Sequence, residues 1–317
     1  MSYWKNKKVL VTGGAGFIGS YLTELLVEAG AEVTVADSLI RGNRSRIQRV
    51  LDNIRLETVD LFDYSNCVKV CKGQDVVLNL AAKVTGIEYN RFHMADMFET
   101  NMKLQMNVLR AASENGVKRC LQVSTACIYP HDAKVPTPES EGGRGTPEPT
   151  NEGYGFAKLM GEKLAKYYTN EKKMEVVIGR PFNAYGPRDH FDEATSHVIP
   201  AIMKRVLDGD DPVEIWGSGN QSRAFVHAKD VARGVMLLAE KAPPAEPINI
   251  GHDHEVAIKE LFAVICKVIG KNPHAHYDTS KPDGYPRRAA DTTLLKKYTG
   301  FVPSISLEDG IREMLEY

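Results

Sequence analysis

Short apolar runs rich in valine, isoleucine and leucine alternate with helical patterns through the first half of the chain. Such runs are typical of strands that are buried on both faces of a parallel sheet. The predicted strands are Lys8–Thr12, Glu32–Ala36, Ile54–Thr58, Val76–Leu80, Arg119–Ser124 and Val176–Arg180. Helices are predicted between them, for example over residues 19–28 and 100–115. The pattern therefore predicts an α/β fold with a doubly wound parallel sheet of the Rossmann type.

The pattern becomes less regular in the second half of the chain. Residues 130–153, rich in Pro, Glu, Gly and Thr, are predicted to form a long surface loop of the kind that is usually functional or mobile. A helix is predicted over 196–207 and a further strand over 247–250. We expect a dinucleotide-binding domain and a smaller C-terminal substrate-binding lobe. The first comprises residues 1–180 with 225–250, and the second comprises residues 181–224 with 251–317.

Composition and charge restrict the class of protein. The 317 residues are 43% hydrophobic and 26% charged, which is ordinary for a globular chain. The 40 Lys and Arg residues nearly balance the 41 Asp and Glu residues, which argues against a nucleic-acid-binding protein. No apolar run reaches the roughly 18 residues that span a bilayer, and the amino terminus lacks the apolar core of a signal peptide. We therefore expect neither a membrane span nor secretion.

The cysteines indicate a reducing environment. Five is an odd number, and their spacing fits neither a disulfide framework nor a zinc site. Cys67 and Cys71 lie four residues apart, as two buried positions on one face of a helix do. We therefore expect no metal site and a cytoplasmic protein.

A glycine-rich turn follows the first predicted strand and precedes the first predicted helix. Gly13, Gly16 and Gly19 allow a tight turn, close approach of the backbone to a pyrophosphate, and packing of the helix on the sheet. The helix that begins near Phe17 and Ile18 directs its positive end at the phosphates. This combination predicts a dinucleotide site.

An acidic residue ends the second predicted strand, about 20 residues after the glycines. Asp37 is placed to accept a hydrogen bond from the ribose 2′-hydroxyl and would repel a 2′-phosphate, so the sequence favours NAD. Arg41 and Arg44 would favour NADP if they bound a phosphate, although such residues more often form a solvated face. Asp60 and Leu61, after the third strand, either flank the adenine or form a plain turn.

Tyr154 and Lys158 lie one turn apart on the same face of a predicted helix. A neighbouring cation lowers the pKa of a phenol, which can then exchange a proton with a sugar hydroxyl as hydride moves. The spacing by itself is unspecific, because other pairs share it: Tyr3 and Lys7, Tyr168 and Lys172, Tyr277 and Lys281. Tyr154 is selected by context, since it follows the long loop and lies near the end of a predicted parallel strand.

The segment Ser124–Pro130 at that strand end carries two more candidates. In extended backbone Thr125 and Cys127 share a face, where Thr125 can hydrogen-bond a substrate oxygen. Cys127 either moves a proton at a carbon atom or is a small buried hydrophobe, and its residue type favours the second. His197 is more often a cap or a surface residue than an acid or base, and we expect His227 to be structural.

Together these segments resemble the extended short-chain dehydrogenase/reductase (SDR) family of nucleotide-sugar enzymes over nearly the whole chain. The segments that are similar to GDP-L-fucose synthases of this family are Ser124–Pro130, Glu148–Lys158, Ser196–Ala201 and Ser280–Gly284. The glycine-rich turn, Asn79–Ala82 and the Ser-Thr-Ala-Cys stretch are more similar to its GDP-mannose 3,5-epimerases. The resemblance implies an enzyme that uses NAD and acts on a nucleotide-diphosphate sugar, with a GDP-sugar favoured.

Matching positions imply roles for individual residues. Thr125, Tyr154 and Lys158 match the hydride-transfer triad, while Cys127 and His197 match the acid–base pair that moves protons at C3 and C5. The residues expected to contact the dinucleotide are Gly13, Gly16, Phe17, Ile18, Gly19, Asp37, Asp60, Leu61, Leu80, Ala81, Ala82, Tyr154 and Lys158. Those expected to contact the nucleotide sugar are Asn183, Arg205, Trp216, Arg223 and Lys281. The resemblance also implies a homodimer, with helices over 100–115 and 154–169 at its interface.

The sequence combines features of two enzyme types. Fucose synthases use NADPH whereas Asp37 favours NAD, and the 3,5-epimerases carry a lysine at the position of His197. The leading expectation is an epimerase that oxidises C4 to a ketone, which acidifies the hydrogens at C3 and C5. The alternatives are a fucose-synthase-type 4-keto-6-deoxy-sugar 3,5-epimerase/4-reductase, a nucleotide-sugar 4-epimerase, and a non-catalytic NAD-binding regulator.

Overall fold

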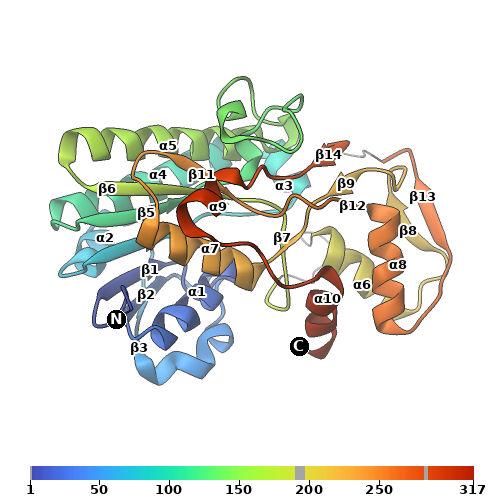
Figure 1. The fold of residues 1–317 in the computed structure, drawn as a ribbon, viewed down its shortest axis with the longest axis horizontal. Helices are drawn as coiled ribbons and strands as arrows, with labels where there is room; N and C mark the ends of the chain where they lie inside the picture. The colour runs from blue at the N-terminus through green and yellow to red at the C-terminus, as the bar shows by residue number, and fades with distance from the viewer. Residues whose placement is uncertain (1, 190–196, 282–284) are drawn as a thin grey trace.

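The computed structural model describes residues 2–189, 197–281 and 285–317. Its centre is a seven-stranded sheet in the order β11-β6-β5-β4-β1-β2-β3, and all neighbouring strands are parallel (Figure 1). The strands are β1 (Lys8–Thr12), β2 (Glu32–Asp37), β3 (Ile54–Thr58), β4 (Val76–Asn79), β5 (Arg119–Val123), β6 (Glu175–Pro181) and β11 (Pro247–Ile250). The predicted doubly wound α/β fold is confirmed, and each predicted strand of this sheet lies within one residue of its observed bounds.

Helices cover both faces of the sheet because successive strand residues point to opposite sides. They are α1 (Phe17–Glu28) and α7 (Ala228–Lys241) on one face, and α2 (Tyr64–Cys71), α4 (Met94–Glu114) and α5 (Glu152–Lys172) on the other (Figure 1). Val9 and Val11 pack towards the first group of helices, and Leu10 packs towards the second. Cys67 and Cys71 are buried on α2, as their spacing predicts.

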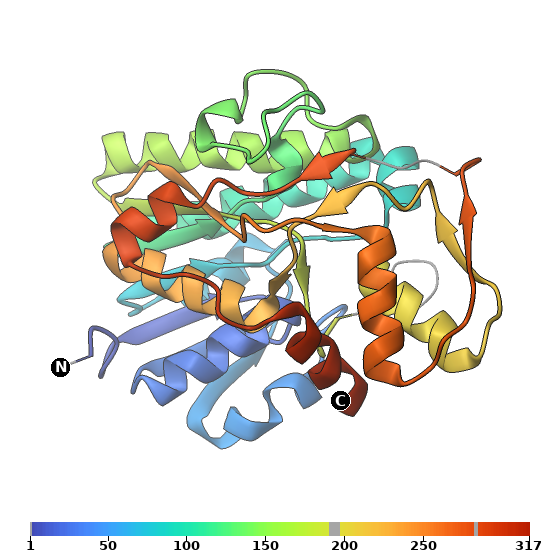
Figure 2. The ribbon, with the colours of Figure 1, turned by 45° about the vertical axis from the view of Figure 1, so that its right-hand side comes forward.

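A smaller lobe lies beside the sheet and has an apolar cluster of its own. Its main elements are α6 (Val198–Asp208), β8 (Val213–Trp216), α8 (Ile258–Ile269), β13 (Ala275–Asp278) and α10 (Leu307–Glu316), and Figure 2 shows α10 beside α8. The predicted helix over 196–207 corresponds to α6, and Ser196 lies outside the described residues. Helix α9 (Thr293–Thr299) instead packs on the sheet side, where Leu295 joins the cluster around α7. The division of the chain into two domains stays a prediction.

Short elements connect these parts. They are η1 (Arg44–Asn53), α3 (Ile87–Phe92), η2 (Ala126–Ile128), η3 (Glu139–Glu141), η4 (Pro149–Asn151), β7 (Ala184–Tyr185), β9 (Ser222–Arg223), β10 (Val226–His227), β12 (Val256–Ala257) and β14 (Arg287–Arg288). Most of the predicted loop over 130–153 is irregular, with η3 and η4 inside it and the start of α5 at its end. Within the described parts of the chain, no helix is long and apolar enough to cross a membrane.

A buried row of polar side chains follows the carboxyl edge of the sheet. The hydroxyl of Thr12 donates to Asn79 Oδ1 at 2.6 Å, and Asn79 Nδ2 donates to Gln122 Oε1 at 2.7 Å. Gln122 Nε2 donates to Gln105 Oε1 at 3.1 Å, and Gln105 Nε2 donates to the carbonyl of Ala157 on α5 at 3.0 Å. This row joins the ends of β1, β4 and β5 to α4 and α5.

A buried ion pair joins β6 to α5. Arg180 Nη2 lies 2.7 Å from Glu162 Oε2, and both side chains are almost completely buried. The hydroxyl of Ser124 donates to Glu162 at 2.5 Å, and Arg180 donates to the hydroxyl of Tyr129 at 2.8 Å. Because Ser124 and Tyr129 flank η2, the ion pair fixes this turn against α5.

Candidate active site

The glycine-rich turn between β1 and α1 leaves no room for side chains. Gly13 has a φ of +67°, and a Cβ atom there would lie 3.1 Å from the amide nitrogen of Ala81. A Cβ atom at Gly19 would lie 2.1 Å from the carbonyl oxygen of Gly13. Gly16 precedes α1 and provides no side-chain cap, so the first N–H groups of the helix are left for an anionic ligand. This geometry fits the pyrophosphate of a dinucleotide.

The carboxylate of Asp37 lies beside the same turn. Its Oδ2 atom accepts a hydrogen bond from the amide of Ala15 at 3.0 Å, and its Oδ1 atom accepts one from the amide of Leu39 at 2.9 Å. A carboxylate has about four acceptor positions, so positions remain for the hydroxyl groups of a ribose. Arg44 is exposed at the start of η1. The glycine-rich turn and Asp37 together fit NAD.

Two further predicted segments lie along this edge of the sheet. The segment Leu80–Ala82 runs beside the glycine-rich turn, because the amide of Ala81 donates to the Thr12 hydroxyl at 3.1 Å. Asp60 and Leu61 follow β3, with Asp60 exposed and Leu61 buried. A contact between this pair and an adenine stays a prediction.

Thr125 lies between the end of β5 and η2. Its hydroxyl accepts a hydrogen bond from the amide of Cys127 at 3.2 Å, and this cap turns the chain into a short helix. The prediction that both residues share a face of extended backbone is therefore wrong. Gly155 lets the start of α5 approach η2, since a Cβ atom there would lie 2.8 Å from the Cys127 carbonyl oxygen. The Thr125 side chain interacts with the Tyr154 phenol and lowers its pKa, which places Tyr154 in the same cluster.

Tyr154 and Lys158 share one face of α5, as predicted, but their pKa values differ from the expectation. Burial raises the pKa of Tyr154, and Cys127 raises it further. Lys158 Nζ donates to the carbonyl of Val123 at 2.9 Å, and burial lowers the pKa of Lys158 to about 8 against an opposing effect of Glu162. The predicted lowering of the Tyr154 pKa is wrong, because the phenol is partly buried and the Lys158 ammonium is directed at the strand, 5.9 Å from the ring centroid.

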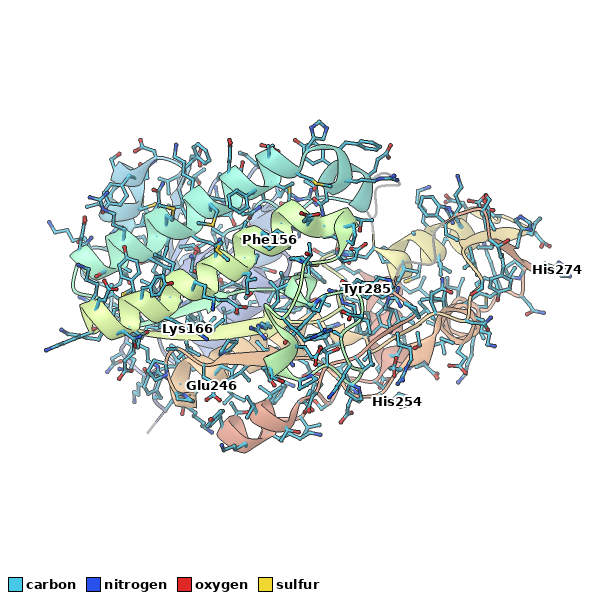
Figure 3. All side chains as sticks on the ribbon, turned by 90° about the horizontal axis from the view of Figure 1, so that it is seen from above. Phe156, Lys166, Glu246, His254, His274 and Tyr285 are labelled. Carbon is cyan, nitrogen blue, oxygen red and sulfur yellow. The ribbon has the colours of Figure 1, made fainter. Side chains whose placement is uncertain are left out.

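An arginine that sequence reasoning missed lies at the Cys127 thiol. Arg288, on β14, directs Nη2 at the Cys127 sulfur from a distance of 3.6 Å. Tyr285 lies against its guanidinium, and Figure 3 shows Tyr285 near the beginning of α5, where Phe156 is labelled. Arg288 and Cys127 are 161 positions apart, so no local spacing in the sequence indicated their contact.

His197 immediately precedes α6. Its Nδ1 atom lies 2.8 Å from Asp189 Oδ2. Partial desolvation would lower the pKa of His197, whose side chain is 58% exposed, but the hydrogen bond and charge of Asp189 outweigh this effect and the charge of Arg41, so the pKa is raised. Among the hydrogen bonds between described residues, none joins His197 to Cys127 or Tyr154. The pairing of His197 with Cys127 across a sugar stays a prediction.

His227 has the structural role that was expected for it. The ring is buried before α7, and its Nδ1 atom accepts a hydrogen bond from the amide of Lys229 at 3.2 Å. Burial lowers the pKa of His227 to about 4, which keeps the ring neutral and suits it to this capping role. The described residues include no group of His, Cys, Asp or Glu side chains arranged to hold a metal ion.

One group of expected nucleotide-sugar contacts lies on the outer part of the lobe. Trp216 ends β8 with about half of its surface exposed, and Lys281 Nζ lies 5.6 Å from the ring centroid of Trp216. Arg205 on α6 donates to the carbonyl of Glu214, next to this pair. An exposed indole with neighbouring cations can stack on a base and bind phosphate. Residues 282–284, the end of the matched segment that contains Lys281, lie outside the described residues.

A second group lies closer to the cysteine. Arg223 donates to the carbonyl of Tyr285 at 2.6 Å, and Asn183 Nδ2 donates to the carbonyl of Arg288 at 3.3 Å. These contacts connect β9, β14 and the segment after β6. The expected sugar-contacting residues therefore extend from the outer lobe to the Cys127 turn.

The comparisons with known proteins agree with this geometry. Residues 9–251 match the model of the NAD dependent epimerase/dehydratase family. The chain belongs to this family. It is 35% identical to GDP-L-fucose synthase 1 of Arabidopsis thaliana, over 99% of this chain and 93% of that protein. It is 32% identical to GDP-mannose 3,5-epimerase 1 of Oryza sativa subsp. japonica, over 98% of this chain and 82% of that protein.

A solved structure supports the same assignment. The UDP-glucose 4-epimerase of Thermotoga maritima, determined with UDP-glucose, superposes with a TM-score of 0.88 at 29% identity and covers 98% of both chains. The predicted extended SDR fold, the NAD-dependent enzyme class and the use of NAD are therefore confirmed.

The lowered pKa of Lys158 predicts a pH-dependent difference in stability between the wild type and Lys158→Met. In the unfolded chain the lysine titrates near 10.4, so between pH 8 and that value the unfolded state binds more protons than the folded state. The free energy of unfolding of the wild type should therefore rise relative to the variant across this range, by at most about 1.4 kcal/mol per pH unit. Urea unfolding of both proteins at several pH values measures this difference in the free energy of unfolding.

Lys163→Met is the matched control, because Lys163 is exposed on the same helix. Its stability difference from the wild type should not change with pH between 8 and 10.4. If the free energies of unfolding of Lys158→Met and of the wild type differ by the same amount at every pH in this range, the lowered pKa of Lys158 is contradicted.

Proposed function

We propose that this protein is an NAD-dependent epimerase of a GDP-sugar that acts at C3, C5 or both through a transient 4-keto intermediate. The observation that carries the proposal is the Cys127 thiol, which lies at the cluster of Thr125, Tyr154 and Lys158 and contacts Arg288. An enzyme that only inverts C4 needs no acid or base at carbon. Relatives named for GDP-L-fucose and GDP-mannose support the guanine nucleotide.

The residues of α5 and η2 suit proton exchange at the sugar C4 oxygen. The glycine-rich turn and Asp37 would hold NAD, which would supply reversible hydride exchange with C4 when bound. Tyr154 exchanges the hydroxyl proton, and Thr125 hydrogen-bonds the same oxygen. Lys158 lies one turn from Tyr154, and its ammonium would favour negative charge on the phenol only after turning away from the Val123 carbonyl. A buried lysine whose pKa is about 8 can also release its proton near neutral pH.

A ketone at C4 makes the neighbouring hydrogens acidic, because the electron pair released at C3 or C5 moves onto the carbonyl oxygen as an enolate. Cys127 can remove or return a proton at one of these carbons. We assign the opposite face to His197, whose pKa Asp189 raises, which favours the protonated imidazole as the proton donor. Cys127 and His197 would then exchange protons on opposite faces of the sugar ring.

One observation favours the fucose-synthase-type 3,5-epimerase/4-reductase as the second candidate. Burial raises the pKa of Tyr154, so the phenol begins as a proton donor. A reductase needs such a donor at the C4 oxygen while hydride arrives at carbon. The two candidates share Cys127 and His197 and differ in whether the cofactor is regenerated within each cycle.

The dinucleotide that the purified protein carries distinguishes these candidates. Denaturing the protein without added cofactor, followed by chromatography, should release nearly one NAD per chain, because an enzyme that returns its hydride regenerates its cofactor in place and need not exchange it. An empty protein that binds NADPH much better than NADH would overturn the epimerase proposal. It would also contradict the inference from Asp37.

Replacement of Cys127 tests its role at carbon. With GDP-mannose in deuterated water, the wild type should incorporate deuterium at C3 or C5, and Cys127→Ser should do so at least about 100-fold more slowly. Mass spectrometry and NMR of the recovered sugar measure the incorporation. Cys266→Ser, which changes a buried cysteine on α8, should exchange at the wild-type rate. Unchanged exchange in Cys127→Ser would remove Cys127 from the mechanism.

We also propose that two copies of the chain pair through α4 and α5. Large apolar side chains are partly exposed on α4, including Met94, Phe98 and Met106. A surface hollow between the two helices is lined by Phe98, Phe156 and Met160. Exposed apolar patches of this kind mark interaction surfaces.

Phe98→Glu should convert the dimer to a monomer at micromolar concentration, because a charge would then be buried in the interface. Sedimentation velocity measures the mass. Val302→Glu alters a more exposed apolar residue beyond α9 and should leave the dimer intact. A wild type that sediments as a monomer would contradict the proposed pairing.

A further inference from the structure

Cys127 differs from the other cysteines in its surroundings. It is partly exposed, whereas the other four are buried: Cys67, Cys71, Cys120 and Cys266. Burial raises the pKa of each buried thiol, and thiols in such surroundings are inert. Reaction with a thiol reagent in the folded protein is therefore expected mainly at Cys127.

The position of Arg288 is fixed on several sides. β14 pairs in parallel with β9, and the carbonyl of Arg288 accepts a hydrogen bond from Asn183 Nδ2 at 3.3 Å. The guanidinium lies 5.0 Å from the ring centroid of Tyr285, whose hydroxyl donates to the carbonyl of Tyr129 at 3.1 Å. A guanidinium supported by an aromatic ring loses conformational freedom. Nη2 thus remains directed at the Cys127 sulfur, 3.6 Å away.

The charges around Arg288 favour its interaction with the sulfur. Within residues 2–189, 197–281 and 285–317, no carboxylate forms an ion pair with Arg288, whereas the neighbouring Arg287 is exposed and pairs with Glu255. The negative charge of Glu148 also raises the pKa of Arg288. Burial would lower the pKa of Arg288, but its interactions, of which that with Cys127 is the largest, raise it.

Other titratable groups near the thiol come from α5 and from the segment before β14. They are the phenols of Tyr154 and Tyr285, and burial raises the pKa of both, so they are uncharged at neutral pH. Arg223 on β9 faces Tyr285 and adds a second positive charge nearby. The local charge is therefore positive on the side of the thiol that Arg288 contacts.

We propose that Arg288 is a positioning residue that stabilises the thiolate form of Cys127 and directs the sulfur at the substrate. An opposite charge within about 4–6 Å favours the charged form of an ionisable group, and hydrogen bonds to that form add to the effect. A partly buried thiol would otherwise disfavour ionisation. Arg288 offsets this cost at the one cysteine that borders Tyr154.

What the thiolate does rests on the proposed function. It takes a proton from C3 or C5 of the 4-keto sugar, so the C–H bond breaks, an S–H bond forms, and the electron pair moves onto the C4 carbonyl oxygen. Return of a proton to the same carbon reverses these changes. No external oxidant or reductant enters this step.

The pH dependence of alkylation tests the interaction between Arg288 and Cys127 without substrate. The full-length protein is treated with iodoacetamide, a neutral reagent that the arginine charge does not attract, and the peptide containing Cys127 is quantified by mass spectrometry. In Arg288→Gln the pH of half-maximal alkylation rate should rise by about one unit or more. At neutral pH the reaction should then be about tenfold slower than in the wild type.

Two matched variants keep the result specific. Arg287→Gln removes the adjacent arginine, which pairs with Glu255, and should leave the alkylation profile unchanged. Arg288→Lys retains the charge and should restore part of the wild-type profile, and Arg288→Met is a second neutral variant if Arg288→Gln fails to fold. Identical profiles of the wild type and of a folded neutral variant, Arg288→Gln or Arg288→Met, would overturn the proposal and would fit an arginine that serves only the sugar diphosphate.

Failure of this proposal can be distinguished from failure of the proposed function. A shifted alkylation profile together with no proton exchange on any GDP-sugar would retain the role of Arg288 and refute the epimerase. Proton exchange by the wild type with an unshifted profile would retain the epimerase and refute the role of Arg288.

Discussion

The geometry of the site depends on the row of buried hydrogen bonds along the carboxyl edge of the sheet. Thr12 begins the row beside the glycine-rich turn, and Gln105 ends it against the backbone of α5. Each side chain in the row satisfies the next, so the loss of one leaves a buried partner unpaired at a cost of about 1–3 kcal/mol. The row therefore fixes the turn that fits the pyrophosphate relative to the helix that carries Tyr154 and Lys158.

The ion pair between Arg180 and Glu162 has a similar effect on the turn that carries Cys127. Glu162 holds Ser124 before the turn, and Arg180 holds Tyr129 after it. Removal of one partner from a buried ion pair typically costs about 3–5 kcal/mol, because the remaining charge is left without compensation. The turn can therefore hold the Cys127 thiol in a fixed direction while its sulfur stays accessible.

The side chains proposed for proton transfer are each influenced by a different environment. Burial lowers the pKa of Lys158, Asp189 raises the pKa of His197, and Arg288 contacts the Cys127 sulfur. Environments that favour opposite protonation states separate groups that donate a proton from groups that accept one. In the proposed site, this separation would provide a proton donor and a proton acceptor at the same pH.

The sequence by itself determined the parallel sheet, the glycine-rich turn and the shared helix face of Tyr154 and Lys158, because these features depend on residues close together in the chain. Resemblance to a family added Cys127 and His197, whose residue types were uninformative. Only the tertiary structure decided that the chain turns at Thr125, that burial raises the pKa of Tyr154, and that Arg288 reaches the thiol. Desolvation and contacts across 161 positions arise from packing between distant segments, which local patterns do not encode.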